Sequence, residues 1–115
     1  MRVASYNIRR GTAKKIEAIQ CFLFEEKLDV LGIIEADIEK NETVPNVPGY
    51  VAHYDETSKK VRVVVYVREG LRTEKINEKV TIPAVSLHIG QVSITIAYND
   101  FTSDNHRMTV AKRRE

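Results

Sequence analysis

The stretch that most constrains the fold of this chain runs from Arg2 to Asp37 and has the pattern of a strand, a helix and a second strand. The first apolar segment contains Asn7 near its end, and the unbroken apolar run from Val30 to Ile34 stops at Glu35. Two strands joined by one helix usually lie parallel in a single sheet, through a right-handed crossover. Parallel strands end at the same edge, where ligands bind in open α/β sheets. We therefore predict an α/β fold (α+β in some schemes), with Asn7 and Glu35 close together at one edge.

Glu35 is the first candidate for a functional residue. A carboxylate at the end of a strand that is buried on both faces is costly to desolvate unless a cation or a hydrogen-bond donor meets it. The alternative is that Asn7 and Glu35 only satisfy backbone groups. Between the two strands, Thr12 follows Gly11 and is expected to cap the helix by accepting hydrogen bonds from free amides of the first turn.

Length and composition indicate a single globular domain. The chain has 115 residues, of which 43% are apolar and 30% are charged. No apolar run approaches the length of a membrane span, and no signal-peptide core is present at the N-terminus. One cysteine excludes an internal disulfide and fits a reducing compartment, so we expect an intracellular protein, nuclear or cytoplasmic.

A basic cluster follows the first strand, at the same edge as Asn7. The net charge of +2 is too small to indicate nucleic-acid binding by itself. The cluster marks a candidate binding surface, and a solvated loop and helix start is the alternative interpretation. Its members are Arg9, Arg10, Lys14 and Lys15.

The rest of the chain is expected to be mainly β-structure. Residues 37–49 have the composition of a polar loop, in which Asp37 and Glu39 are interpreted as solvated acids. Residues 50–54 and 61–67 have the pattern of a hairpin. Pro83 confines residues 80–87 to an edge or a broken strand, whereas residues 92–98 alternate as a regular strand.

The last part of the chain is polar and then basic. Residues 99–106 are dense in groups that bind metal or phosphate, and they are interpreted as a capped turn. Residues 109–115 are expected to form the first turns of a helix.

Four motifs occur in the order found in a known family: ASYNIRRG, DVLGIIE, GYVAHY followed by VRVVVYVRE, and ITIAYNDF. The sequence resembles the amino-terminal part of the endonuclease/exonuclease/phosphatase family, and the Asn-Asp-Phe of the last motif resembles its LINE-type retrotransposon branch. The resemblance covers nearly all of the chain. It implies a two-sheet β-sandwich flanked by helices, of which residues 1–115 would be the amino-terminal half, a partial domain.

The resemblance also implies roles for single residues. Glu35 would ligate a catalytic divalent cation, Mg²⁺ or Mn²⁺, and Asn7 would help to hold the phosphate and the active-site network. Tyr98 would contact the scissile phosphate. Magnesium takes oxygen ligands and often needs only one or two protein carboxylates. Nucleic acid, with DNA favoured over RNA, would be the partner, and Arg9, Arg10 and Lys14 would contact it.

Two departures from the family pattern limit this interpretation. The later Gly-Asp-x-Asn strand and the carboxyl-terminal Asp-His pair are absent, since Ser103-Asp104-Asn105-His106 follows Tyr98 too soon to be the latter. We expect a domain truncated before its later catalytic motifs, with an apolar sheet face left exposed and available for association.

Three hypotheses follow from these observations. The first is a fragment of a metal-dependent phosphodiesterase, an endonuclease in particular. The second is an inactive remnant of that fold, which at most binds nucleic acid or a partner. The third is an unrelated small α/β binding domain.

Overall fold

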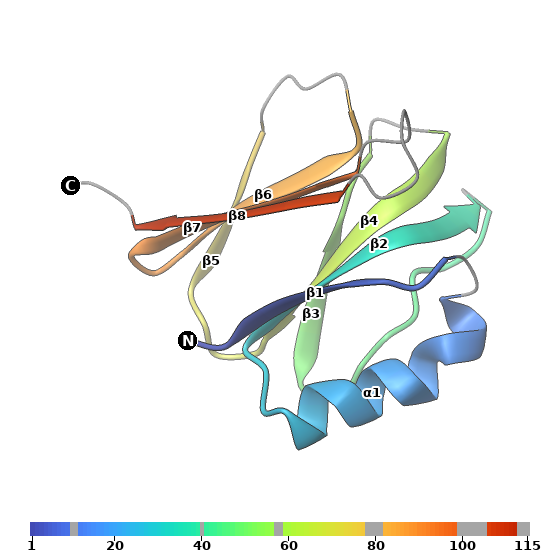
Figure 1. Ribbon diagram of the computed structural model, residues 1–115, viewed down its shortest axis with the longest axis horizontal. Coiled ribbons are helices and arrows are strands. Elements are labelled where there is room, and N and C mark those ends of the chain that lie inside the picture. The colour runs from blue at the N-terminus through green and yellow to red at the C-terminus, as the bar shows by residue number, and fades with distance from the viewer. Residues whose placement is uncertain (10–11, 40, 57–58, 78–81, 99–105, 113–115) are drawn as a thin grey trace.

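The computed structural model describes residues 1–9, 12–39, 41–56, 59–77, 82–98 and 106–112. These residues form two four-stranded sheets, one α-helix and one short 3₁₀ helix (Figure 1). The elements in chain order are β1 (Val3–Asn7), η1 (Ala13–Lys15), α1 (Ile16–Glu25), β2 (Val30–Glu39), β3 (Tyr50–Tyr54), β4 (Lys60–Arg68), β5 (Thr73–Ile76), β6 (Ala84–Ile89), β7 (Val92–Tyr98) and β8 (His106–Lys112).

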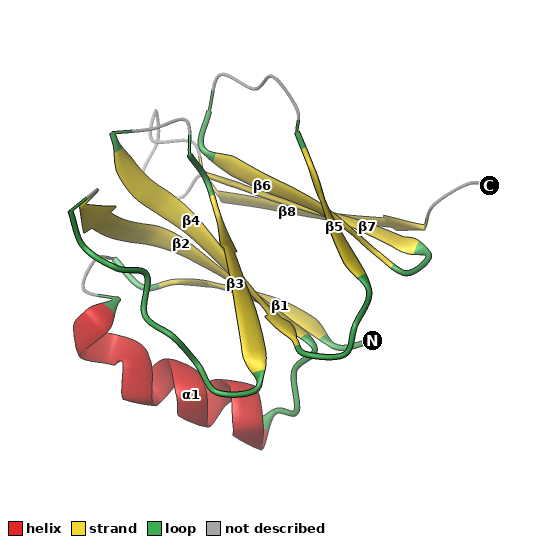
Figure 2. Ribbon diagram, turned by 180° about the vertical axis from the view of Figure 1, so that it is seen from behind, coloured by secondary structure: helices red, strands yellow, loops and turns green. Residues whose placement is uncertain are grey.

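The two sheets form a β-sandwich. Sheet A has the strand order β1-β2-β4-β3 and sheet B has the order β5-β6-β7-β8. β1 and β2 are parallel and are connected through α1, whereas the other neighbouring strands are antiparallel. Figure 2 shows sheet A lying between α1 and sheet B. The predicted α/β class, with its strand-helix-strand beginning and its two-sheet sandwich, is confirmed.

One core fills the space between α1 and sheet A. Ile19 and Leu23 of the helix pack on the outer side chains of the central strands, among them Leu31 and Tyr66. The Tyr66 hydroxyl donates a hydrogen bond to the carbonyl oxygen of Pro45 at 2.8 Å, and burial raises the pKa of Tyr66 to about 12. No helix in the described part of the chain is long and apolar enough to cross a membrane.

A second core joins the two sheets. Valine and isoleucine side chains on the inner face of sheet A contact the inner side chains of β6 and β7. The expectation of an apolar sheet face exposed for association is therefore wrong for this face. The chain returns after β4 and builds a second sheet over it, which removes that apolar surface from water. The sheet A residues of this core are Val30, Ile34, Val63, Val65 and Val67.

Two expectations about the second half of the chain are also wrong, that of an edge strand around Pro83 and that of a helix after residue 109. β6 is an interior strand of sheet B that begins at Ala84, so Pro83 precedes it and leaves its ladder of amide donors intact, while residues 80–81 lie outside the described residues. The Pro83 carbonyl oxygen accepts the amide of Tyr98 at 2.9 Å. Residues 106–112 form β8 and not a helix, since pairing with the edge of β7 satisfies their backbone groups.

The two sheets approach each other closely at Gly32. A Cβ atom added to Gly32 would lie 2.1 Å from Cδ1 of Ile96. We expect Gly32→Ala to destabilise the protein by about 1 to 3 kcal/mol, the usual cost of overpacking a core. Urea denaturation followed by circular dichroism measures this change. Adding Ile96→Val, which removes Cδ1, should restore part of the loss, and equal stability of the single and double variants would contradict a steric cause.

Protonation of His53 in β3 is expected to make the stability of the protein depend on pH. Burial of the imidazole, and secondarily the charge of Lys75, lower the pKa of His53 below its usual value of 6.5. The unfolded chain therefore binds a proton at a higher pH than the folded protein does. We expect the contribution of neutral His53 to the free energy of unfolding to be fully present above pH 6.5. This contribution should be lost as the pH falls from 6.5 through the lowered pKa of the folded protein.

Urea denaturation of wild type and His53→Gln over this pH range checks the prediction. His53→Gln should have a flatter dependence of the unfolding free energy on pH than wild type. His88→Gln is the control for the loss of a histidine from sheet B. An unchanged slope in His53→Gln would show that another group causes the loss of stability in acid.

Candidate functional site

Asn7 and Glu35 lie at neighbouring positions on the carboxyl edge of sheet A. In the parallel pairing of β1 and β2, Asn7 is the partner of Ile34, the residue that precedes Glu35. The amide of Ile8 extends this pairing by donating to the Ile34 carbonyl oxygen at 3.2 Å. The two strand ends are therefore brought together as expected, while the chemical roles of Asn7 and Glu35 stay predictions.

A β-bulge shapes β2 at this edge. The strand does not stop at Glu35, as its apolar run predicts, but continues to Glu39. Its pairing with β4 is interrupted between Ile34 and Ile38, where three residues of β2 lie opposite the single residue Arg62. Bulges of this kind bend a strand and redirect its side chains. The three residues are Glu35, Ala36 and Asp37.

The bulge changes which face of sheet A each side chain occupies. In a regular strand, alternate residues share one face. Ile34 packs in the core between the sheets, whereas Ala36 and Ile38 pack in the core under α1. The backbone makes this change through positive φ angles at Glu35 (57°) and Asp37 (48°). Such angles are uncommon outside glycine and persist only where neighbouring groups hold them.

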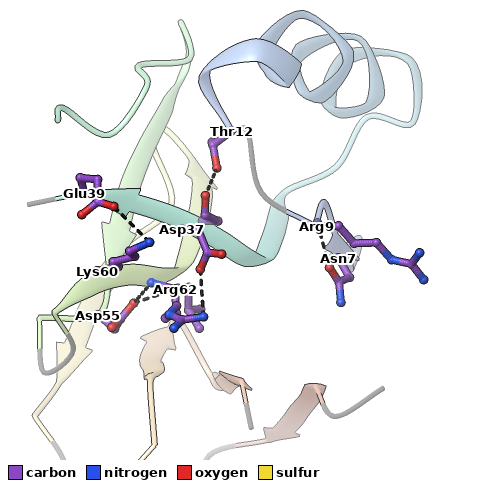
Figure 3. Close-up of polar contacts among 10 residues, drawn as sticks. Asn7, Arg9, Thr12, Asp37, Glu39, Asp55, Lys60 and Arg62 are labelled. Carbon is purple, nitrogen blue, oxygen red and sulfur yellow. Dashed lines mark hydrogen bonds and ion pairs between the residues drawn. The ribbon is translucent and has the colours of Figure 1, made fainter. Parts of the chain in front are cut away.

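Thr12 is one of the groups that hold the bulge. Its buried hydroxyl donates a hydrogen bond to the carbonyl oxygen of Ala36 at 3.0 Å (Figure 3). The expected capping role is wrong, because the Thr12 side chain makes no hydrogen bond to the amides of the first helical turn. The hydroxyl instead ties the start of η1 to the bulged strand.

Asp37 and Arg62 form an ion pair across the bulge. Nη1 of Arg62 lies 3.0 Å from Oδ1 of Asp37, whose side chain is only 10% exposed. The interpretation of Asp37 as a solvated acid is therefore wrong. The face change in β2 turns its carboxylate towards β4 instead of towards water. For Glu39 the solvated interpretation is confirmed, since its side chain is 51% exposed and pairs with Lys60 at 3.1 Å.

Tyr98 reaches the same edge from sheet B. The guanidinium carbon of Arg62 lies 5.7 Å from the centre of the Tyr98 ring, and Tyr98 packs in the core that also contains Ile34. Arg62 thus connects the bulge of sheet A with the end of β7. The sequence motifs identified Tyr98 but not Arg62, whose position in a valine-rich strand carries no separate signal.

Asp55 is a second residue that the sequence did not single out. The residue is 3% exposed, and its Oδ1 accepts hydrogen bonds from the backbone amides of Arg62 and Val63, both at 2.8 Å (Figure 3). Two successive amides pointing to one acceptor fix the β4 backbone opposite the bulge. The available signal was the position of Asp55 directly after a strand, where aspartate often binds backbone amides.

The basic cluster lies beside Asn7. Arg9 and Lys14 are exposed, while Arg10 is outside the described residues. The Asn7 side-chain oxygen accepts the Arg9 amide at 3.0 Å, and Lys15 donates to the carbonyl oxygen of Ile8. In Figure 3, Asn7 and Arg9 lie apart from Asp37 and Arg62. Ser103, Asp104 and Asn105 are also outside the described residues.

The donor set at this edge fits a hard cation held by few protein ligands. Glu35 is partly exposed, and its carboxylate makes no hydrogen bond or ion pair with another residue that the structure describes. Those residues contain no group of three or more His, Cys, Asp or Glu side chains arranged to hold a metal. Magnesium keeps several waters and often takes only one or two carboxylates, so Glu35 with water ligands fits it.

Asp55 provides a test of what holds the site together. We expect Asp55→Ala to destabilise the protein by about 2 to 3 kcal/mol, because a buried and a partly buried backbone amide lose a charged acceptor. Urea denaturation measures the loss, and Glu56→Ala, at the adjacent exposed residue, is the control. Equal stability of the two variants would mean that the Asp55 hydrogen bonds do not stabilise β4.

The site therefore combines a bulged strand end, an ion pair and a tyrosine from the second sheet. Neither the scan against family models nor the search of curated proteins returns a match for this sequence.

Proposed function

We propose that this chain is the amino-terminal portion of a metal-dependent phosphodiesterase domain that resembles the endonuclease/exonuclease/phosphatase family and acts on nucleic acid inside the cell. The observation that carries the proposal is the placement of Asn7, the last residue of β1, beside Ile34, the residue of β2 that precedes Glu35. The connection of the bulge to Tyr98 through Arg62 supports it. Asn7, Glu35, Arg62 and Tyr98 come from four separate motifs, and the carboxyl edge of the parallel strands β1 and β2 is the usual ligand edge of such sheets.

Each residue has a distinct role in the proposed site. Glu35 binds the divalent cation, Mg²⁺ or Mn²⁺, through its carboxylate. Such a cation polarises a phosphoryl oxygen and stabilises the leaving oxygen during attack by water. Tyr98 contacts the scissile phosphate, and Asn7 orients the loop that follows β1 through its hydrogen bond to the Arg9 amide. Arg9, Arg10 and Lys14 supply positive charge for the nucleic-acid backbone, which we propose is DNA rather than RNA.

A second candidate function is a remnant that binds nucleic acid without cleaving it. The hydrogen bond from the Arg9 amide to the Asn7 side-chain oxygen favours this candidate, because it gives Asn7 a structural role that needs no reaction. Binding without cleavage would still depend on Arg9 and Lys14. The two candidates therefore differ in catalysis and agree in binding.

A nicking assay on supercoiled plasmid distinguishes them. The phosphodiesterase proposal expects magnesium-dependent nicking that Glu35→Gln abolishes and EDTA prevents, because the cation loses its carboxylate ligand. Glu39→Gln is the matched control, since Glu39 lies on the same strand but is exposed and paired with Lys60. Binding of the plasmid without nicking, under conditions where the protein is folded, would reject catalysis by residues 1–115 alone and leave nucleic-acid binding as the function of this chain.

A further inference from the structure

We propose that Arg62 is a phosphate-binding residue and that Asp37 occupies its guanidinium when no phosphate is present. The class of ligand, a phosphate ester anion, follows from the proposed function, on which the inference rests. The inference adds one binding residue to the same site. The observation behind the proposal is the position of the Arg62 guanidinium, which lies between the bulge of β2 and the ring of Tyr98.

The guanidinium is held in a way that leaves part of it accessible. Asp37 lies at Nη1, the Tyr98 ring lies against the guanidinium, and the backbone amide of Arg62 is fixed by Asp55. The Arg62 side chain is still 30% exposed. Arginine has five N–H donors in a planar fork that matches the oxygens of a phosphate, so one carboxylate does not exhaust them.

The charge of Asp37 has two effects on the neighbouring Arg62. A carboxylate and a phosphate are both anions that pair with a guanidinium. The Asp37 carboxylate therefore balances the charge of Arg62 in the unliganded protein, through the ion pair at 3.0 Å. It also competes with an incoming phosphate, by charge repulsion and by its hold on Nη1.

This competition predicts opposite effects of two substitutions. Asp37→Asn should bind phosphate about tenfold more tightly than wild type, because it removes one neighbouring negative charge. Arg62→Gln should bind it about tenfold more weakly, as expected for the loss of one charged hydrogen bond. An ion pair that serves only stability predicts neither change.

The structure offers a matched control pair on the same strand. Arg68 lies at the other end of β4, where its Nη2 is 2.5 Å from Oδ1 of Asp29, and its side chain is 53% exposed. Arg68 is therefore more exposed than Arg62, and it also pairs with an aspartate, but at the opposite edge of the sheet. Asp29→Asn and Arg68→Gln should leave phosphate binding unchanged.

The experiment follows the side-chain Nε–H signals of Arg62 and Arg68 by NMR during titration with inorganic phosphate, and separately with a dinucleotide that carries one phosphodiester. EDTA is present throughout, and sodium chloride at matched ionic strength is the reference. We expect a saturable shift at Arg62 and none at Arg68. A response to phosphate alone assigns a free phosphate or monoester, whereas a response to both includes the phosphodiester.

The inference is overturned if neither wild type nor Asp37→Asn shows a saturable shift at Arg62, or if both arginines respond equally. Direct observation of Arg62 in wild type keeps the test valid when a variant folds poorly. Because magnesium is excluded, the outcome is independent of nicking. If phosphate binds at Arg62 but Glu35→Gln leaves nicking unchanged, the catalytic role of Glu35 is rejected and the inference about Arg62 stands.

Discussion

The interruption of the β2–β4 pairing at Arg62 is the constraint on which the candidate site depends. Three residues of β2 lie opposite one residue of β4, so the strand must change faces within a few positions. That change turns Asp37 towards Arg62 while Ala36 remains in the core under α1. Thr12 holds the bulged side and Asp55 holds the β4 side. The strained backbone is thus supported from two elements that lie far apart in the sequence.

The two-layer core makes this edge possible. Sheet A is covered by α1 on one face and by sheet B on the other, so its central strands are apolar on both sides. Gly32 lets the two sheets approach, because a side chain there would meet Ile96. Close packing of the sheets places Tyr98, at the end of β7, in the same core as Ile34 and against Arg62, which lies opposite the bulge. The same burial lowers the pKa of His53, which couples the stability of the sandwich to acid.

Much of the fold could be predicted from periodicity, and less of the site could. The alternating residues of β7 and the strand-helix-strand beginning are local patterns, and both are confirmed. The continuation of β2 past Glu35 could not be predicted, since polar residues after an apolar run usually mark a loop. β8 was missed because its strand conformation depends on the edge of β7.

The sequence alone determined that the apolar runs ending at Asn7 and at Glu35 lie in two parallel strands, because an apolar run on each side of a helix leaves few other arrangements. Only the tertiary structure decided that Asp37 is an ion-pair partner and not a solvated acid. It also decided that Arg62 and Tyr98 share this edge, since they come from different sheets. The physical reason is that a bulge, and the contacts across a sandwich, depend on strand register and on the distance between sheets. Neither quantity is encoded in any single stretch of residues.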